Sequence, residues 1–570
     1  VSTLQRAVDA HVVNAREKRH GRIYFNFQQY LEELLPGMMK RCCGLVLQLT
    51  LLHLGATKTN DRSPHIILIV ADDLGWNDVS WNNHKMHTPN LQRLAREGVI
   101  LNQSYVLPTC TPTRAALLTG RYPYKLGIQG HGIRHLEPYG LPLGITTLPE
   151  ELKRRNYSTH AFGKWHLGYC NWSLTPTHRG FDTFRGYYLG SKDYFNHTIS
   201  ERKPVLQEDT GDMQERKAKI QAYGYDYRNG DSVDYSAKGI YSTNTTLIAN
   251  NVMETIEKNS KQNQSMFIYV AFQAVHAPLQ VPNGYRTMCS SHTNKRRVKI
   301  CEMVAVMDHA VGLIVKKLKD VEMWSNSLLL FMSDNGAQVR FGGSNWPLRG
   351  NKNTLYEGGT RVPAFVSGPL LHRSNCTSSS LIHVVDWFPT LLSVTGALWN
   401  NTLDEIDGVD QWSTISNGTE PAPRTEFIYN LNRKKGKFSG AIREGDLKLI
   451  LRPSKTFNSW YAESEEQPEK VNLGGRAHTS LLYNITADPT ERKDLFSEMK
   501  NEAERLIAKL NDQISLMVPA PSLEDQAEGH PNRLVPRGVF SPGWCKAPVW
   551  KKTETVTRAL RNKPESWDDE

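Results

Sequence analysis

Apolar runs along the chain alternate with amphipathic stretches. Four runs, the last one weaker than the others, cover 65–75, 266–278, 327–336 and 158–168. Continuous apolar runs bounded by turn residues are typical of strands buried on both faces, as in a parallel sheet. Apolar residues recur with helical spacing in 90–98, 145–156, 247–259 and 302–320. This alternation predicts an α/β sandwich with a mostly parallel sheet and crossover helices on its faces.

Each apolar run stops at polar residues that are capable of chemistry. They are Asp72 and Asp73, His276, Asp334 and Asn335, and Lys164 with His166. A single Asp after a strand is commonly a helix cap, but capping does not explain four such ends in one chain. Because ligands bind outside the carboxyl ends of parallel strands, the common edge is predicted to be a functional site. The hard oxygen donors among these residues favour Ca²⁺ or Mg²⁺ over a soft metal.

The last third of the chain shows a different pattern. A helix-like run at 387–396 is followed by a turn-rich stretch that ends near residue 424. Short strand patterns and one helix follow it, at 426–430, 447–451 and 498–514. We therefore expect a main domain over 57–424, a smaller α+β domain with an antiparallel sheet over 425–548, and a charged tail over 549–570.

The N-terminal region contains a signal-like segment at an unusual place. Residues 38–56 combine a basic start, an apolar stretch and Gly55-Ala56, which together are typical of a secretory signal peptide. Residues 1–37 then read as an upstream extension, and the alternative is a helical pro-segment. Ten glycosylation triplets agree with the secretory pathway, and they begin at Asn102, Asn156, Asn171, Asn196, Asn244, Asn263, Asn375, Asn400, Asn417 and Asn484. No later segment is long enough to span a membrane.

Composition narrows the function classes only slightly. With 39% hydrophobic and 22% charged residues the 570-residue chain is predicted to be globular, not disordered. The net charge of +11 suits an anionic partner. Its two clearest basic runs, 294–299 and 432–437, lie beside turn residues and are interpreted as solvated loop charges, so no nucleic-acid partner is expected.

The chain contains eight cysteines, and their disulfide pairing is only partly indicated by the sequence. Cys42 and Cys43 fall within the predicted signal, and Cys289 and Cys301 enclose a short polar loop that suits a disulfide. If Cys110 is reserved for chemistry, three cysteines remain, namely Cys170, Cys376 and Cys545. One of these three is expected to be free or paired between molecules, and the sequence does not assign the pair.

The segment around Cys110 is the most specific feature of the chain. Thr111 is predicted as a helix N-cap, Pro112 fits the first turn, and Gly120 would end the helix. Cys110 would then lie just before a helix N-terminus, where the backbone amides attract an anion, with Arg114 adding positive charge. A lone Cys is more often a buried apolar residue or half of a disulfide. The combination of Cys-x-Pro-x-Arg with 119-TGR-121 argues against those alternatives.

The sequence 110-CTPTR-114 with 119-TGR-121 resembles the sulfatase family signature, and 163-GKWHLG-168 resembles its second signature. The similarity covers roughly residues 63 to 545. Within the family the chain looks closest to the arylsulfatase B, I and J group, through 276-HAPLQVP-282, 334-DNGAQ-338 and 345-NWPLRGNK-352. The resemblance implies an alkaline-phosphatase-like fold and hydrolysis of sulfate esters.

The resemblance also implies a role for each matching residue. Cys110 would be converted to formylglycine by the formylglycine-generating enzyme, act as the nucleophile and touch the metal. The calcium ligands would be Asp72, Asp73, Asp334 and Asn335. The remaining groups would be Arg114 and Lys164, which hold the hydrate, His166, its hydrogen-bonding partner, and His276 and Lys352, which hold the sulfate and its leaving oxygen. Thr113 stands where the family usually has Ser, and this difference leaves the extent of Cys110 conversion open.

Three functions remain open at this point. The favoured one is hydrolysis of a sulfated glycosaminoglycan, by resemblance to N-acetylgalactosamine-4-sulfatase, in the lysosome or outside the cell. A phosphate-ester hydrolase of related fold is the second, although no paired transition-metal ligands are evident. The third is an inactive sugar-binding protein, against which the intact set of Cys110, Lys164, His166, His276 and Lys352 argues. The polar stretch from Asn196 to Asp231 is predicted to be a variable loop on the substrate side.

Overall fold

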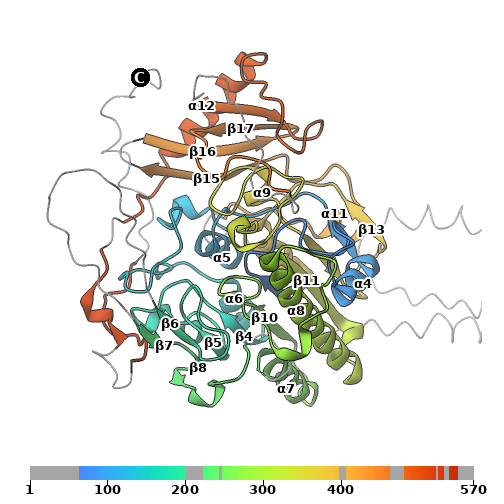
Figure 1. Ribbon diagram of the computed structural model, residues 1–570, viewed down its shortest axis with the longest axis vertical. Coiled ribbons are helices and arrows are strands. Elements are labelled where there is room, and N and C mark those ends of the chain that lie inside the picture. Colours follow the sequence, from blue (N-terminus) through green and yellow to red (C-terminus); the bar gives the residue numbers. More distant parts are fainter. Residues whose placement is uncertain are drawn as a thin grey trace, which may run out of the picture. The chain divides into compact units, whose positions relative to one another are not determined.

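The computed structural model describes most of the chain after residue 62 (Figure 1). The described residues are 63–200, 223–242, 247–396, 406–434, 437–462, 480–521, 524–531 and 538–549. The predicted extension over 1–37, the signal segment over 38–56 and the tail beyond Val549 lie outside them, as does the middle of the predicted substrate-side loop.

A ten-stranded mixed sheet forms the centre of the fold, in the order β13-β2-β12-β11-β1-β10-β4-β5-β8-β9. The five neighbours from β11 to β5 are all parallel, and antiparallel pairs flank them on both sides. The strands are β1 (His65–Ala71), β2 (Val99–Leu101), β4 (Ser158–Lys164), β5 (Thr183–Tyr187), β8 (Arg228–Asn229), β9 (Ser232–Val233), β10 (Met266–Ala271), β11 (Ser327–Ser333), β12 (Ala364–Ser367) and β13 (Cys376–Ser378). The predicted mostly parallel sheet is thus confirmed.

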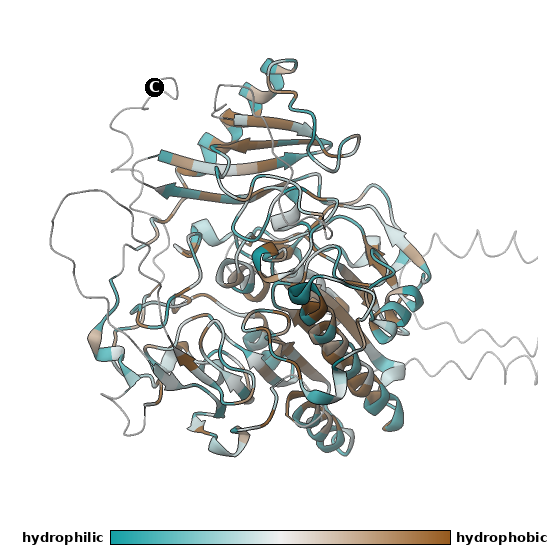
Figure 2. Ribbon diagram, viewed as in Figure 1, coloured by the Kyte–Doolittle hydropathy of each residue, from teal (hydrophilic) through white to brown (hydrophobic). Residues whose placement is uncertain are grey.

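Strand β1 shows why the apolar runs are unbroken. Its residues Ile66 to Ala71 are all fully buried, and Ile67 lies level with Ile268 of β10 and Leu329 of β11. Successive side chains point to opposite faces, so Ile66 and Leu68 enter one hydrophobic core while Ile67 and Ile69 enter another. The residues of the central strands are accordingly apolar (Figure 2).

Helices cover both faces of this sheet (Figure 1). One core takes apolar residues from α4 (Pro89–Glu97), α7 (Ile248–Ser260) and α8 (Lys295–Asp320). The other takes them from α5 (Cys110–Thr119), α6 (Leu148–Arg154) and α10 (Trp387–Val394). Two short helices, α9 (Glu357–Thr360) and α11 (Trp412–Asn417), complete this part. This arrangement confirms the predicted sandwich.

Local capping sets the helix bounds where they differ from the prediction. Helix α8 begins seven residues before the predicted residue 302, because the Asn294 side chain accepts hydrogen bonds from the amides of Arg296 and Arg297. Helix α6 begins later than predicted, at Leu148, where Thr147 and Glu150 form a capping box.

A separate four-stranded antiparallel sheet follows, in the order β15-β16-β17-β18. Helix α12 (Lys500–Ile514) buries Ala503, Leu506 and Leu510. The strands are β15 (Glu426–Lys434), β16 (Lys437–Glu444), β17 (Leu447–Leu451) and β18 (Ser480–Asn484). The smaller antiparallel sheet expected in this region is present, while the exact domain boundary near residue 424 stays a prediction.

Two small sheets and several single turns of 3₁₀-helix make up the remaining regular structure. The sheets pair β3 (Ser104–Tyr105) with β14 (Ile382–His383) and β6 (Thr198–Ser200) with β7 (Tyr223–Tyr225). The turns are η2 (Pro123–Lys125), η3 (Trp172–Leu174), η4 (Pro176–His178), η5 (Tyr235–Ala237), η6 (Asn283–Tyr285), η7 (Trp324–Asn326), η8 (Val339–Phe341), η9 (Val384–Asp386) and η10 (Ala527–Gly529).

The structure shows how the cysteines pair. Cys289 and Cys301 form the predicted disulfide, and Cys170 pairs with Cys545 across 375 residues of sequence. Cys376, on the edge strand β13, is the remaining unpaired cysteine expected from the count, and Cys110 is buried and free. Among the described residues, no helix has the length and apolar character needed to cross a membrane.

Candidate active site

The carboxyl ends of four parallel strands bring the sequence-predicted residues to one edge of the sheet. Backbone hydrogen bonds hold these ends together beyond the strands: the Asp72 amide donates to the Ala274 carbonyl at 2.9 Å, and the Asp334 amide donates to the Ala71 carbonyl at 3.0 Å. Asp73 adopts a left-handed backbone conformation with φ of 60°. This turn aims two consecutive side chains into the same space, although non-glycine residues seldom adopt it.

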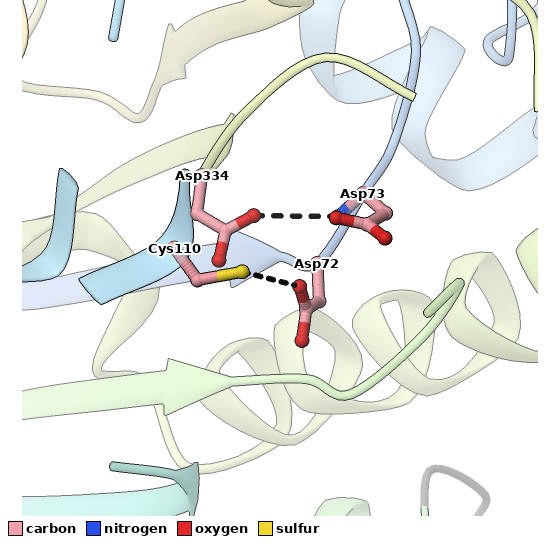
Figure 3. A group of neighbouring side chains, drawn as sticks. All are labelled: Asp72, Asp73, Cys110 and Asp334. Atoms are coloured by element: carbon pink, nitrogen blue, oxygen red, sulfur yellow. Dashed lines mark hydrogen bonds between the residues drawn. The ribbon is translucent and has the colours of Figure 1, made fainter. Parts of the chain in front are cut away.

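Three aspartates and Cys110 gather in a small buried cluster (Figure 3). One ligand atom from each of Asp72, Asp73, Cys110 and Asp334 lies within 4.8 Å of all the others. The Cys110 sulfur is 3.4 Å from Oδ1 of Asp72, and the Asp73 amide donates to Oδ1 of Asp334 at 3.3 Å. Asp72 and Asp73 follow β1, Asp334 follows β11, and Cys110 begins α5, so three separate elements build the cluster.

Each aspartate is bonded to one cation. Lys164 Nζ lies 2.6 Å from Asp72, and Lys352 Nζ lies 2.6 Å from Asp73 and 3.3 Å from the Cys110 sulfur. Arg114 donates to Oδ2 of Asp334 through Nη2 at 2.7 Å and Nε at 3.1 Å. All of these side chains are buried. The cluster therefore combines three negative and three positive charges that are shielded from water.

Burial and neighbouring charges shift the pKa values of the cluster residues, and for Asp72 they act in opposite directions. Burial by itself would raise the pKa of Asp72, but Lys164, His276 and Arg114 outweigh it and hold that pKa below its usual range. Burial and then the Asp72 charge raise the pKa of Asp334. Burial, Asp334 and Asp72 raise the pKa of the Cys110 thiol to about 12. The thiol is therefore neutral in this protein at physiological pH.

Helix α5 starts earlier than its sequence suggested. Cys110 is its first residue and Thr109 is the N-cap, so the predicted N-cap at Thr111 is wrong. The reason is tertiary: the Thr111 hydroxyl donates to the His166 carbonyl at 2.9 Å and accepts from the Ile133 amide at 3.2 Å, so it does not cap the helix. Gly120 ends the helix in the left-handed conformation, as predicted.

His166 lies in a cradle that sequence reasoning missed. Its Nε2 is 3.0 Å from the Ile133 carbonyl oxygen, which requires a proton on Nε2 in the neutral ring and leaves Nδ1 as the acceptor. Nδ1 has no hydrogen-bond partner within the described residues. A Cβ added at either Gly132 or Gly190 would lie 2.8 Å from the His166 ring. Burial, followed by the charge of Lys164, holds the pKa of His166 well below its usual value.

His276 lies on the other side of the cluster, with its Nε2 3.7 Å from Oδ2 of Asp73. A tyrosine that was not predicted holds its backbone. The Tyr194 hydroxyl lies 2.8 Å from the His276 carbonyl oxygen and 2.9 Å from that of Gln273. The side chain of Gln280 adds two bonds, accepting from the Tyr194 amide and donating to Asp193, each at 2.7 Å.

Arg114 has a further partner that the sequence did not reveal, because the Tyr269 hydroxyl from β10 lies 3.1 Å from its Nη1. The only available signal for Tyr269 was a polar tip inside an apolar strand, and Tyr194 stands in the polar stretch 191-SKDYFNHT-198 without any signal of its own. Many buried tyrosines share the signal of Tyr269. In contrast, every site residue proposed from the sequence, including Asn335, is brought to this edge of the sheet, where the Asn335 amide nitrogen donates to Oδ1 of Asp73 at 2.7 Å.

Comparison with known proteins identifies the family. The Sulfatase family model matches residues 64–397, which is more than half of the chain and includes all of the clustered residues. The chain belongs to the sulfatase family. This sulfatase is therefore a sulfuric ester hydrolase, and its active-site cluster is the candidate catalytic centre.

The sulfatase is similar to several characterised relatives. It is 36% identical to arylsulfatase J of Mus musculus over 518 residues, which cover 86% of this chain and 81% of the relative. It is 31% identical to N-acetylgalactosamine-6-sulfatase of Sus scrofa, with coverage of 79% and 84%. Human arylsulfatase A is 29% identical, with coverage of 82% and 90%.

Solved structures agree with this sulfatase fold. The crystal structure of Ps i-CgsB in complex with k-i-k-neocarrahexaose aligns with a TM-score of 0.65 at 28% identity and covers 82% of this chain and 96% of that one. The PsFucS1 sulfatase from Pseudoalteromonas sp. aligns with a TM-score of 0.62 at 20% identity, covers 86% of this chain and 97% of that one, and supports the fold alone.

Proposed function

We propose that this sulfatase removes sulfate from glycosaminoglycan sugars such as N-acetylgalactosamine 4-sulfate, with Cys110 converted to formylglycine and one calcium ion bound beside it. One observation carries the proposal: the Cys110 sulfur lies 3.4 Å from Asp72 and 3.3 Å from Lys352. The side chain of residue 110 is thereby held between an acidic ligand set and a cation that suits sulfate.

The donor set fits calcium. It comprises the carboxylates of Asp72, Asp73 and Asp334 and the amide oxygen of Asn335, and Asn335 Oδ1 is buried without a hydrogen-bond partner among the described residues. Hard oxygen donors of this kind suit Ca²⁺ or Mg²⁺, and the resemblance to sulfatases favours calcium. A bound calcium would supply positive charge that neutralises and orients the sulfate group.

As formylglycine, residue 110 would supply an aldehyde hydrate, one hydroxyl of which attacks sulfur while the other allows sulfate to leave. The chain's own residues hold and move the protons. We assign acceptance of the attacking hydroxyl's proton to Asp334, which lies in the same cluster. Nδ1 of His166, left without a proton by the Nε2 bond to Ile133, accepts the proton of the second hydroxyl.

Binding of the ester and departure of its alcohol fall to the remaining groups. Arg114 and Lys164 hold the hydrate, and Lys352, on the other side of the sulfur, neutralises the sulfate oxygens. His276, which is 20% exposed at the edge of the cluster, protonates the departing sugar oxygen. Its partial exposure supports this role, because the alcohol part of the substrate would lie toward the solvent.

The relatives support a sulfated carbohydrate as the substrate. Arylsulfatase J and N-acetylgalactosamine-6-sulfatase are named for sulfate hydrolysis, the second for a sulfated amino sugar. The Ps i-CgsB structure contains an oligosaccharide, k-i-k-neocarrahexaose. The predicted signal segment and the glycosylation triplets support a lysosomal or extracellular enzyme that meets the formylglycine-generating enzyme during synthesis.

Mass spectrometry of the peptide that contains Cys110, taken from secreted protein, tests the modification. Formylglycine is roughly 18 mass units lighter than cysteine, so a peptide lighter by that amount is expected. Only unmodified Cys110 in folded, active protein would refute the proposed nucleophile. Assays on matched sulfate and phosphate esters test the alternative, and faster cleavage of the phosphate ester would favour a phosphate-ester hydrolase.

Replacement of the nucleophile provides the second test. Cys110→Ala should abolish sulfate release while secretion and melting temperature stay close to those of the wild-type protein, because the buried thiol makes only two weak hydrogen bonds with the described residues. Cys376→Ala is a matched control, since Cys376 is the other free cysteine within the described residues. Activity retained in Cys110→Ala would exclude the assignment.

A further inference from the structure

Two acid-free segments leave the same edge of the sheet as the active-site residues. Residues 275–301, which follow β10, contain five Arg and Lys and no Asp or Glu. Residues 335–356, which follow β11, contain three Arg and Lys and again no acid. The first segment carries His276 and the second carries Asn335 and Lys352. Both segments therefore begin inside the candidate active site and lead outward from it.

The outer parts of these segments meet each other. Arg296 Nη1 donates to the Arg340 carbonyl at 2.8 Å, and the buried Arg297 bonds Asp78, six residues after Asp72. Arg286 lies next to Thr287, whose amide donates to Glu302 of α8 at 2.9 Å. Arg286, Lys295, Arg296 and Arg340 are all exposed, and we call these four residues the cationic rim.

The cationic rim lies at the carboxyl edge of the sheet. Helix α8 leads into β11, which is parallel to β1, so the helix runs antiparallel to these strands and begins at the edge that holds the active site. Hydrogen bonds connect the rim segment to Lys352: the Lys352 amide donates to the Ala337 carbonyl at 3.1 Å, and the Val339 amide donates to Asn351 Oδ1 at 2.8 Å.

The four charges of the rim are not neutralised by acidic side chains of the described residues, although Arg296 donates to the Arg340 carbonyl and the Arg340 guanidinium lies over the Phe341 ring. In the described part of the chain, none of the four pairs with a carboxylate, whereas the neighbouring Lys299 pairs with Glu302 at 3.3 Å. Lys295 and Arg296 even occupy the first turn of α8, which has no acidic residue, although cations at a helix N-terminus are unfavourable. Charges that lower the stability of a helix and have no carboxylate partner are suited to an external anion.

We infer that the cationic rim binds the part of a sulfated polysaccharide chain that continues beyond the sugar being cleaved. The inference rests on the proposed function, because it places the reacting sulfate at Cys110 and the rest of the chain across the rim. A polymer that carries a regular row of negative charges would contact several rim residues at once. A small aryl sulfate occupies only the catalytic cluster and would not reach the rim.

The test compares one variant with a matched control. The rim variant is Arg286→Gln, Lys295→Gln and Arg340→Gln, and the control is Lys258→Gln, Lys261→Gln and Lys319→Gln. The control residues are also exposed, but they directly precede β10 or β11 and lie at the opposite edge of the sheet. Helix α8 has 26 residues and is about 39 Å long, which separates Lys295 from Lys319 by most of that length. Both variants remove three positive charges.

Kinetics give the first readout. In the rim variant we expect KM for a sulfated chondroitin octasaccharide to rise about tenfold at low ionic strength while kcat is unchanged. KM for 4-nitrocatechol sulfate should stay within about twofold of the wild-type value. The control variant should have the same kinetics as the wild-type protein on both substrates. An equal loss on both substrates, or no loss on the octasaccharide, would overturn the inference.

Binding gives a second readout that needs no turnover. A fluorescent chondroitin sulfate octasaccharide is titrated into Cys110→Ala protein with and without the rim substitutions, and about tenfold weaker binding is expected with them. If the rim substitutions weaken binding but the wild-type protein has no sulfatase activity, the proposed function is refuted while the assignment of the cationic rim as a binding surface stands. Equal affinity for single-stranded DNA of the same charge would overturn the assignment to a sugar chain.

Discussion

Asp72, Asp73 and Asp334 share a buried space in which each is bonded to its own lysine or arginine. Like charges at such short range repel, and their cations offset the repulsion only while every pair is intact. Removing one member of a buried pair leaves an unpaired charge, which costs about 3 to 5 kcal/mol. Substitutions of these aspartates or of their cations thus affect stability as well as catalysis, and each requires a control elsewhere in the core.

Calcium binding can be measured separately from activity. We expect calcium to raise the melting temperature, because a ligand that binds only the folded protein stabilises it by about 2.7 kcal/mol at one hundred times its Kd. Asp73→Asn should reduce that rise, since it removes one charged donor. Thermal unfolding with calcium and with a chelator provides the measurement.

A buried aspartate outside the cluster is the control. Asp308 accepts hydrogen bonds from the amides of Asn90 and Leu91, so Asp308→Asn should lower the melting temperature itself. The rise caused by calcium should nevertheless persist in that variant. If Asp73→Asn kept the full rise, the cluster would not be the calcium site.

At the scale of elements, the segment from Tyr188 to His197 positions both candidate histidines. The His166 amide donates to the Tyr188 carbonyl at 3.0 Å, and Gly190 lies against the His166 ring. Six residues after Tyr188, the Tyr194 hydroxyl bonds the carbonyl of His276. One loop thus sets the position of the proposed base and of the proposed acid relative to each other.

Tyr194→Phe removes only the hydroxyl of this contact. We expect kcat to fall roughly tenfold for a sugar sulfate, because His276 would be held less firmly beside the departing oxygen. The fall should be smaller for 4-nitrophenyl sulfate, whose leaving group needs no proton. Initial rates on the two substrates, measured across a pH range, provide the comparison.

Tyr157→Phe is a matched control at the start of β4, where a buried tyrosine hydroxyl donates to the Pro64 carbonyl at 2.7 Å. It should lower stability slightly without changing the ratio of the two rates. A uniform decrease on both substrates in Tyr194→Phe would mean that the tyrosine is only structural.

The strands and most of the site were predictable because their signals are local. An apolar run that ends in Asp-Asp or Asp-Asn specifies both a buried strand and the residues at its end, as β1 and β11 show. The start of α5 was not predictable, because the Thr111 hydroxyl is used by His166 and Ile133, which are distant in sequence. Tyr194 and the glycine cradle were missed for the same reason.

At the scale of the whole molecule, a buried ionic network joins the main sheet region to the antiparallel sheet. Lys448 of β17 lies 2.8 Å from Glu357 of α9 and 2.9 Å from Glu491, and all three side chains are fully buried. Burial raises the pKa of Glu491 to about 7, with Lys448 opposing the rise and Glu357 adding to it. Arg361 also faces Glu357, at 3.7 Å.

This network predicts a pH-dependent stability. The pKa of Glu491 is about 7 in the folded protein and near its ordinary value of 4.5 in the unfolded chain, so the folded state binds the proton more tightly. The contribution of this group to stability is fully present below pH 4.5 and is lost as the pH rises through 7, and it is on the order of 3 kcal/mol. Glu491→Gln should reduce the gain in melting temperature between pH 7.5 and pH 5.

Glu302→Gln is the control for this prediction, because Glu302 is also buried but, within the described residues, bonds Thr287 and Lys299 and no other partner. It should leave the pH dependence of the melting temperature unchanged. If Glu491→Gln retained the full dependence, other groups would be responsible for it.

The burial of Cys110 has a consequence for the order of events during biosynthesis. Only 2% of the residue is exposed, and it is enclosed by Asp72, Lys352 and strands that are made later, including β10 and β11. Domains fold as the chain emerges, so the enclosure is incomplete until Lys352 has been synthesised. If Cys110 is converted as proposed, the modifying enzyme must reach it within this limited time, and conditions that speed folding would leave more of the protein unconverted.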